Sequence, residues 1–170
     1  MEPEHCDQCG FDGGTFTEAA LLAALRELGP KWRTLLEQSG PELRVRPAPE
    51  VWSAIEYAAH SRDVTALHVF GVEQALTAAE PTFPAIEGDD LIQSAAATYE
   101  DEDPTAVVAA LQSAADRMAQ LAEVAGSGTW SRGLTIGDSR MDVRRLLEHA
   151  LHDSQHHLDD VARGGAAMSR

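Results

Sequence analysis

The residues with the clearest chemical potential in this chain lie near its C-terminus, where four of the seven histidines fall within residues 149–157. Imidazoles and carboxylates that are four residues apart lie above one another on one face of a helix. Two such pairs are present, His152 with His156 and Asp153 with His157. Each pair could supply two ligands to a metal ion, because imidazole nitrogen and carboxylate oxygen are common zinc ligands.

The small and apolar residues of the same segment predict which pair faces the interior of the protein. At about 100° per residue they form one stripe along a helix. The stripe consists of Val143, Leu147, Ala150, Leu151, Ser154, Leu158 and Val161. Asp153 and His157 lie at the border of this stripe, whereas His152 and His156 lie near the opposite face. We therefore predict an inward pair, Asp153 with His157, and an outward pair, His152 with His156.

A third ligand for the inward pair must come from another helix, because a catalytic zinc usually takes three protein ligands and keeps one position open. His60 is the strongest candidate, since Trp52, Glu56, His60 and Val64 recur every four residues along one helical face. A histidine at such a position can also be an ordinary core or surface residue. Glu56 is predicted to be a general base or a hydrogen-bond partner of a ligand. The alternatives for Glu56 are a solvated helix carboxylate or a charge in the N-terminal turn of its helix.

The outward histidine pair could belong to a second metal site. Cys6 and Cys9 are the two cysteines of the chain, and they form a single Cys-x-x-Cys motif. With two histidines they would complete a tetrahedral set for a structural zinc, and Gly10 suits the tight turn of a zinc knuckle. His5 could replace one of the histidines. The alternative is a free or redox-active dithiol beside ordinary exposed histidines.

The elements that must position these residues are predicted to be helices, because the hydrophobic period is close to 3.6 and no strand of period 2 is convincing. The first helix should begin at Thr15 or Thr17 and be interrupted at Gly29-Pro30. The last should be closed by Gly164-Gly165. The four expected helices cover residues 15–38, 49–79, 105–125 and 142–163.

This pattern predicts an all-α fold, a four-helix bundle. We expect the bundle to comprise residues 15–165, preceded by a zinc-knuckle-like segment of residues 1–14. Residues 127–140 are rich in glycine and are expected to form a long loop, with a short extended piece at residues 134–136 as an alternative.

Composition limits the partners of the protein. Its 170 residues include 28 acidic and 13 basic side chains, and the resulting net charge of -15 repels nucleic acids and anionic membranes. The N-terminal sequence lacks the regions of a secretory signal, and no apolar run approaches the roughly 20 residues of a membrane span. We therefore expect a cytoplasmic protein that binds neither nucleic acid nor membrane. A broad apolar face on the bundle would allow a homodimer.

Two motifs together resemble the DinB/YfiT-like metalloenzymes over nearly all of the chain after about residue 15. The first is Trp52-Ser53-x-x-Glu56-x-x-x-His60, and the second is His152-Asp153-x-x-His156-His157-Leu158-x-Asp160-Val161. The second is similar to the pattern of the mycothiol-dependent maleylpyruvate isomerase branch, whose ligands are a histidine on helix two and Glu-x-x-x-His on helix four.

The resemblance places the metal ligands on His60, Asp153 and His157. This chain has aspartate where that branch has glutamate, and the shorter side chain could alter the geometry of the site or weaken metal binding. Other members use three histidines, so ligation by His152 and His156 remains an alternative.

By resemblance, the chain is expected to bind zinc or another divalent metal such as nickel. The family's activity implies a thiol S-transferase or isomerase of the mycothiol type, in which the metal activates a low-molecular-weight thiol that attacks an electrophilic substrate. A metal-dependent hydrolase and a non-catalytic metal-binding bundle are the two alternatives.

Overall fold

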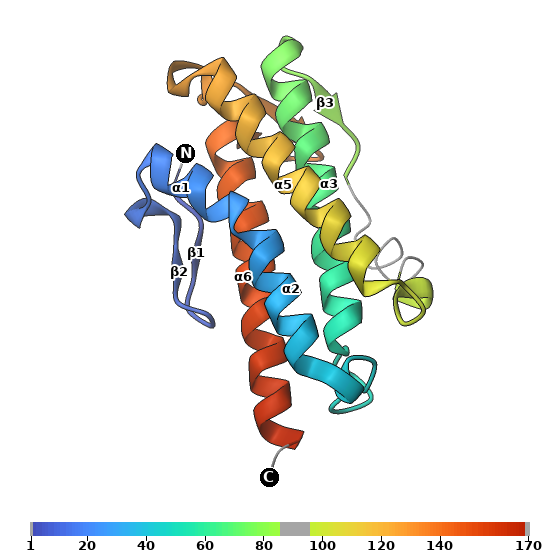
Figure 1. Cartoon of the computed structure of the whole chain (residues 1–170). Helices are drawn as coiled ribbons and strands as arrows, with labels where there is room; N and C mark the ends of the chain where they lie inside the picture. The colour runs from blue at the N-terminus through green and yellow to red at the C-terminus, as the bar shows by residue number, and fades with distance from the viewer. Residues whose placement is uncertain (1, 86–95, 169–170) are drawn as a thin grey trace.

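The computed structural model describes residues 2–85 and 96–168, with side chains as far as residue 164. Most of these residues are helical, and the long helices lie side by side as a bundle (Figure 1). The helices are α1 (Glu18–Arg26), α2 (Leu28–Ser39), α3 (Ala54–Thr77), α5 (Pro104–Ala125) and α6 (Val143–Met168). The bundle is therefore confirmed as the main part of the fold, with α1 and α2 in place of the first predicted helix.

The core of the bundle lies between α2, α3, α5 and α6. Helices α2 and α3 each pack against both α5 and α6. Trp32 of α2 is fully buried, and its indole Nε1–H donates a hydrogen bond to Ser154 Oγ of α6 over 2.7 Å. A buried indole normally finds such a partner. This bond joins α2 to α6 and helps to set which α6 side chains face α3.

The break between α1 and α2 falls at Glu27, before the predicted interruption at Gly29-Pro30. Both residues lie in the first turn of α2, where a proline is tolerated because the first N–H groups of a helix have no intrahelical acceptor. Gly29 serves packing, since a Cβ atom there would lie only 2.7 Å from Cβ of Gln112 in α5. The glycine thus allows α2 and α5 to approach closely, which the sequence pattern did not reveal.

Two other helix limits also differ from the prediction. Helix α3 begins at Ala54, after Ser53, and not near Pro49-Glu50. Helix α6 continues through Gly164-Gly165 to Met168. A helical glycine costs only about 1 kcal/mol relative to alanine, so it does not oblige a helix to end. A Cβ atom at Gly164 would lie 2.9 Å from Cγ of Pro47, so this glycine allows the loop before α3 to pack on α6.

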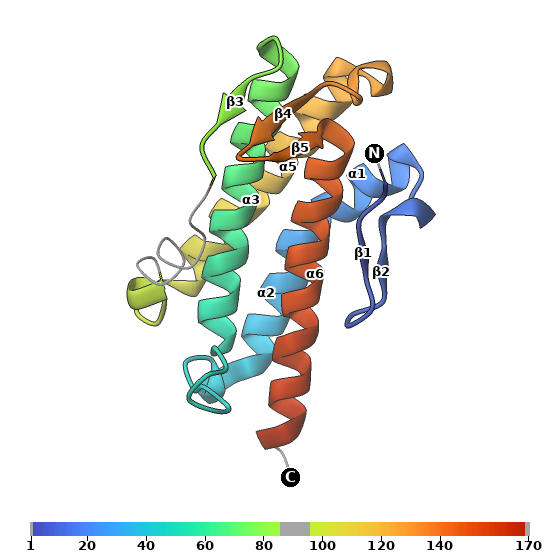
Figure 2. The same cartoon turned by 180° about the vertical axis from the view of Figure 1, so that it is seen from behind.

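Short strands correct the all-α prediction. Strands β1 (His5–Cys6) and β2 (Phe11–Asp12) form an antiparallel hairpin, which lies beside α6 (Figures 1 and 2). Strand β3 (Thr82–Phe83) pairs in parallel with β4 (Gly133–Ile136), which pairs antiparallel with β5 (Ser139–Asp142). The predicted loop of residues 127–140 therefore contains most of a hairpin, and the alternative of a short extended piece at residues 134–136 is confirmed by β4. These strands of two and four residues are too short to produce a recognisable alternation of polar and apolar side chains.

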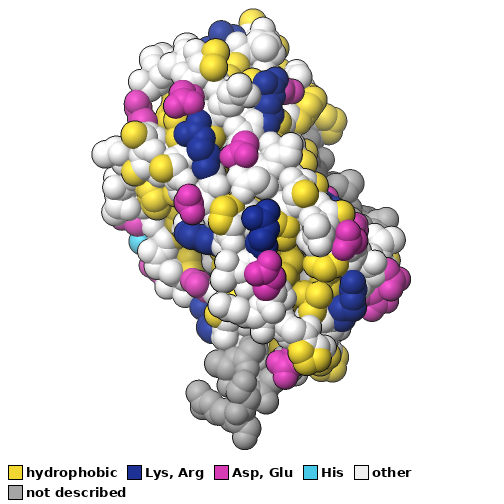
Figure 3. Space-filling model, in the orientation of Figure 1, with side chains coloured by type: hydrophobic (Ala, Val, Ile, Leu, Met, Phe, Trp, Pro, Cys, Tyr) yellow, Lys and Arg dark blue, Asp and Glu magenta, His cyan; other side chains and the backbone are white. Residues whose placement is uncertain are grey.

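The surface of the bundle is mixed in charge. On the face drawn in Figure 3, Lys and Arg side chains lie among Asp and Glu side chains and do not gather in one area. Arg26 pairs with Glu123 over 2.7 Å, and Arg117 with Glu73 over 2.9 Å. Within residues 2–85 and 96–168, no helix combines the length and the apolar character that crossing a membrane requires.

Candidate metal centres

The inward cluster is assembled by the packing of α3 against α6. His60 comes from α3, and Asp153 and His157 come from α6; one ligand atom of each lies within 4.8 Å of the others. Nε2 of His60 is 3.7 Å from Asp153 Oδ1, and Nε2 of His157 is 3.6 Å from the same oxygen. The structure thus groups His60 with the pair that the helical periodicity predicted to face inward.

Neighbouring side chains hold the two imidazoles of this cluster. Nδ1 of His157 lies 3.0 Å from Asp160 Oδ2, a contact that leaves Nε2 of His157 facing Asp153. The ring of Tyr57 stacks on His157 with centroids 4.8 Å apart, and the ring of Trp52 lies 5.2 Å from that of His60. Sequence reasoning missed these contacts of Asp160 and Tyr57, although the spacing of three residues between His157 and Asp160 was a usable signal.

The electrostatics of the inward cluster suit a cation. Burial alone would raise the pKa of Asp153, but His157 and then His60 outweigh burial and hold this pKa well below its usual range. Burial alone would lower the pKa of His157, but Asp153 and then Asp160 raise it. The Asp153 carboxylate is therefore ionised at neutral pH.

Asp153 Oδ2 is buried and has no hydrogen-bond partner among the described residues. Leaving a charged group without all its partners is costly in a protein interior. A divalent cation would satisfy this oxygen, and a set of two imidazoles and one carboxylate fits zinc, nickel and related metals. The residues present therefore fit a metal ion.

The contacts of Glu56 favour a structural role over the predicted role in catalysis. Glu56 is 1% exposed and not solvated; its Oε2 accepts hydrogen bonds from the Ser53 backbone N–H over 2.9 Å and from Ser53 Oγ over 2.7 Å. Arg46 Nε lies 3.0 Å from both carboxylate oxygens. Burial opposes ionisation, but Arg46 and then Ser53 lower the pKa of Glu56. Its carboxylate closes the first turn of α3 in a capping box.

Glu56→Gln is expected to leave metal content and turnover within about threefold of the parent, because loss of a general base would cost about 10²–10⁴-fold. The unfolding free energy should fall by about 1–3 kcal/mol, as for loss of a hydrogen bond between charged groups. Because folding lowers the pKa of Glu56, its contribution is present above the unfolded pKa of about 4.3 and is lost at lower pH. Chemical denaturation at neutral and acidic pH measures this change in unfolding free energy. If Glu56→Gln kept its metal but lost most of its turnover, Glu56 would act as a general base after all.

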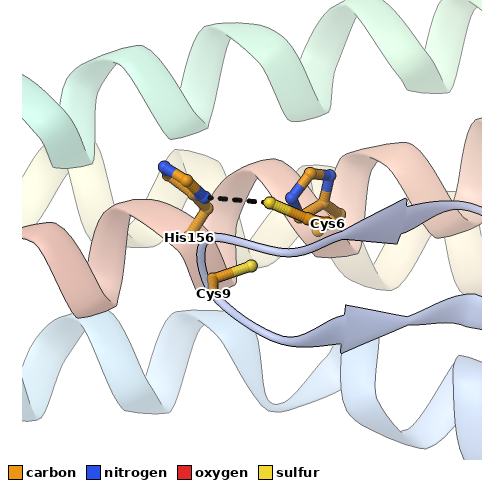
Figure 4. Close-up of side chains that lie close together, drawn as sticks. Cys6, Cys9 and His156 are labelled. Carbon is orange, nitrogen blue, oxygen red and sulfur yellow. Dashed lines mark hydrogen bonds between the residues drawn. The ribbon is translucent and has the colours of Figure 1, made fainter.

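The outward cluster brings the N-terminal hairpin and α6 together. Ligand atoms of Cys6, Cys9, His152 and His156 all lie within 4.8 Å of one another. Both cysteines are unpaired thiols near the turn of the hairpin, and Cys6 Sγ lies 3.8 Å from Nδ1 of His156 (Figure 4). His5 does not join this cluster: it is exposed and its Nε2 pairs with Asp7 over 3.0 Å. The structure thus turns the outward pair towards the cysteines, whereas His60 groups with the inward pair.

Glu4 forms a third group with His149 and His152, which sequence reasoning missed. Glu4 Oε1 lies 2.9 Å from Nδ1 of His152, and Glu4 Oε2 lies 3.3 Å from Nδ1 of His149. Arg145 Nη2 also lies 2.6 Å from Glu4 Oε2. The guanidinium already supplies the positive charge at this carboxylate, so the third group is poorly suited to a metal cation. Glu4 lies in a segment without helical periodicity, so the sequence held no signal for its position.

A cleft of about 240 Å³ lies between α2, the start of α3 and the end of α6. Trp52 and Asp160 line it, and these two residues also contact His60 and His157 of the inward cluster. The cleft therefore reaches the side chains that hold the imidazoles of that cluster. Its volume is below the range of about 300–1,000 Å³ that is usual for ligand sites.

Comparisons with known proteins agree with this architecture. A family model described as the DinB superfamily matches residues 14–161. Among solved structures, the chain is similar to YfiT from Bacillus subtilis, a probable metal-dependent hydrolase with an unusual four-helix bundle topology, with a TM-score of 0.76 and 18% identity over 99% of this chain and 94% of that chain. At this identity the likeness concerns the fold. No curated protein matches the sequence, and neither match identifies the maleylpyruvate isomerase branch.

Proposed function

This chain belongs to the DinB superfamily, and on that premise we propose that it is a metal-dependent enzyme that activates a small nucleophile at His60, Asp153 and His157. One observation carries this proposal: three ligand atoms from two packed helices lie within 4.8 Å of one another, and one of the three residues, Asp153, has a buried carboxylate oxygen, Oδ2, with no hydrogen-bond partner in the described part of the chain. Three protein ligands are the usual number for a catalytic zinc, which keeps a further position for substrate or water.

The residues around the cluster have separate tasks in this proposal. A divalent ion held there would supply Lewis acidity, which lowers the pKa of a thiol or water at its open position. Asp153 contributes negative charge, and its short side chain is held between two imidazoles. Asp160 accepts the Nδ1 proton of His157, which leaves the Nε2 lone pair free to bind metal. Tyr57 and Trp52 cover the imidazole rings and limit the access of water to them.

The first candidate reaction is thiol transfer or isomerisation. It is supported by the similarity of the α6 motif, residues 152–161, to the pattern of the mycothiol-dependent branch. A low-molecular-weight thiol would lose its proton to solvent, and its sulfur would attack an electrophilic carbon of the second substrate. In transfer, the new carbon–sulfur bond replaces the bond to a leaving group, which departs with its electron pair; in isomerisation, the thiolate adds to a carbon–carbon double bond and is expelled again after rotation. The cleft beside Trp52 and Asp160 offers space for the organic part of a small substrate next to the cluster.

Hydrolysis is the second candidate, and one observation favours it. The fold is similar to that of YfiT, which is described as a probable metal-dependent hydrolase. The same three ligands would serve this reaction, because a metal lowers the pKa of water as it does that of a thiol. The two candidates therefore differ in the nucleophile and not in the residues that hold the ion.

The experiment that separates these candidates uses protein stripped of metal and reloaded with zinc or nickel. Thiol transfer is measured with mycothiol or glutathione and chlorodinitrobenzene, and hydrolysis with nitrophenyl acetate and nitrophenyl phosphate without thiol. Metal-dependent turnover that requires the thiol supports a transferase, whereas thiol-independent release of nitrophenol supports a hydrolase. Bound metal without turnover in either assay would argue for a non-catalytic metal-binding bundle.

A further inference from the structure

The turn of the N-terminal hairpin has the local structure of a metal-binding loop. Gly10 has a φ of +74°, and its N–H donates to the Cys6 carbonyl over 2.9 Å. The backbone N–H groups of Cys9 and Gln8 are directed at the Cys6 sulfur.

We propose that Cys6, Cys9, His152 and His156 form a closed, structural zinc site that fastens the N-terminal hairpin to α6. This site is separate from the inward cluster and requires no catalytic activity. The proposal rests on the convergence of the four side chains, on the orientation of both imidazoles and on the balance of charge.

The orientation of His152 leaves one ring nitrogen for a metal. Its Nδ1 lies 2.9 Å from Glu4 Oε1. Its Nε2 is buried and has no hydrogen-bond partner in residues 2–85 and 96–168. A carboxylate that accepts the proton of one ring nitrogen while the other nitrogen binds zinc is the common arrangement in zinc proteins. The ring of Phe11 stacks on His152 with centroids 5.0 Å apart and holds it in place. Glu4 is therefore a positioning residue for this ligand.

His156 is oriented in a similar way but through its other nitrogen. Its Nδ1 lies 3.8 Å from Cys6 Sγ, and its Nε2 lies 3.6 Å from Asp160 Oδ2. With ordinary zinc bond lengths and a tetrahedral angle, sulfur and nitrogen ligands of one ion lie about 3.6 Å apart. The observed distance is close to this value. Asp160 therefore lies beside one histidine of each cluster, His156 and His157.

Charge balance favours zinc in the outward cluster over zinc in the neighbouring group of Glu4, His149 and His152. Two thiolates neutralise a divalent ion, and two neutral imidazoles complete its four ligands. No open position remains, so the site suits a structural role. In the group of Glu4, His149 and His152, Arg145 already pairs with Glu4. His152 directs Nδ1 towards Glu4, which leaves its Nε2 for the outward cluster. Arg144 and Glu148 of α6 also contact the backbone of the N-terminal segment, so zinc would reinforce an existing interface.

The test is zinc content per chain in protein purified without a chelator or an affinity tag. The parent, Cys6→Ser/Cys9→Ser and Asp153→Asn are compared, with His5→Ala as a matched control for an exposed histidine of the same segment. Loss of one equivalent in the cysteine variant, and none in His5→Ala, is expected. Asp153 belongs to the inward cluster and not to the outward one, so Asp153→Asn is expected to keep the zinc that the cysteine variant loses. Parent-like metal content in Asp153→Asn would contradict the proposed function but not the structural zinc site.

Cobalt substitution provides a second measurement that does not depend on total metal. Cobalt bound to thiolate gives a charge-transfer absorption in the near ultraviolet, which should be present in the parent and in Asp153→Asn and absent in the cysteine variant. The circular dichroism of the cysteine variant verifies that the bundle is still folded. Unchanged zinc content in the cysteine variant, or thiols in the zinc-loaded parent that react with a thiol reagent as fast as free cysteine, would overturn the proposal.

Discussion

Asp153→Asn is expected to empty the inward metal site and to lower metal-dependent turnover by more than about 100-fold. The exchange keeps the size of the side chain but removes the negative charge between His60 and His157. Loss of a group that merely supports a ligand typically costs about 10–100-fold in affinity or activity, and loss of the ligand itself should cost more. Metal content and turnover at saturating metal are the two measurements.

Asp159→Asn is the matched control for this variant. Asp159 is exposed on the same helix, so its replacement removes the same charge without touching the inward cluster. We expect parent-like metal content and turnover in this control. If Asp153→Asn kept its metal and its turnover, the assignment of the inward site would be wrong, whatever the outcome at the cysteines.

His68→Asn is expected to make the protein less sensitive to acid. His68 is 8% exposed, and burial first, then His149, lowers its pKa to about 4. Its Nδ1 lies 2.8 Å from the Val64 carbonyl, and its ring stacks on His149. In the unfolded chain the His68 imidazole takes up a proton near pH 6.5, whereas in the folded protein it does so only near pH 4. The contribution of His68 to stability is therefore present above pH 6.5 and is lost as the pH falls towards 4. Between pH 7.5 and 5 this loss amounts to about 2 kcal/mol.

The measurement is the unfolding free energy of parent and variant at a series of pH values under the same metal load. Asparagine can keep the donor to the Val64 carbonyl but does not titrate, so the parent should lose about 2 kcal/mol more than the variant between pH 7.5 and 5. The exposed His5 provides a control, because His5→Ala should follow the parent at every pH. Parallel curves for the parent and His68→Asn would contradict a depressed pKa at this position.

Much of the fold could be predicted because long helices leave a strong periodic signal. The spacing of apolar residues located the bundle, Thr17 was a correct candidate for the first cap, and Pro104 marks the start of α5. Membership of the DinB superfamily was also predicted correctly from the two motifs. The convergence of His60, Asp153 and His157 followed from the same periodicity, because a helical wheel shows which side chains face a neighbour. Metal binding by this cluster remains a prediction.

The remaining features depend on contacts between segments that are distant in the sequence. Arg46 reaches Glu56 from a loop, and Glu4 reaches His152 across 148 residues. No local pattern encodes such pairs. The sequence predicts a helix end at Gly164, whereas in the structure this glycine leaves room for Pro47 beside α6. Local sequence thus predicts which face of a helix is inward, but it does not predict which loop covers the other face.

Helix α6 carries residues of both clusters at adjacent positions, 152 and 156 for one and 153 and 157 for the other. Neighbouring residues differ by about 100° around a helix axis, so a torsional movement of α6 displaces both ligand pairs at once. An ion bound at either cluster would therefore restrict the rotation of α6 about its axis, and so help to position the residues of the other cluster. The N-terminal hairpin would then restrict the rotation of α6, and the metal affinities of the two clusters would be thermodynamically linked.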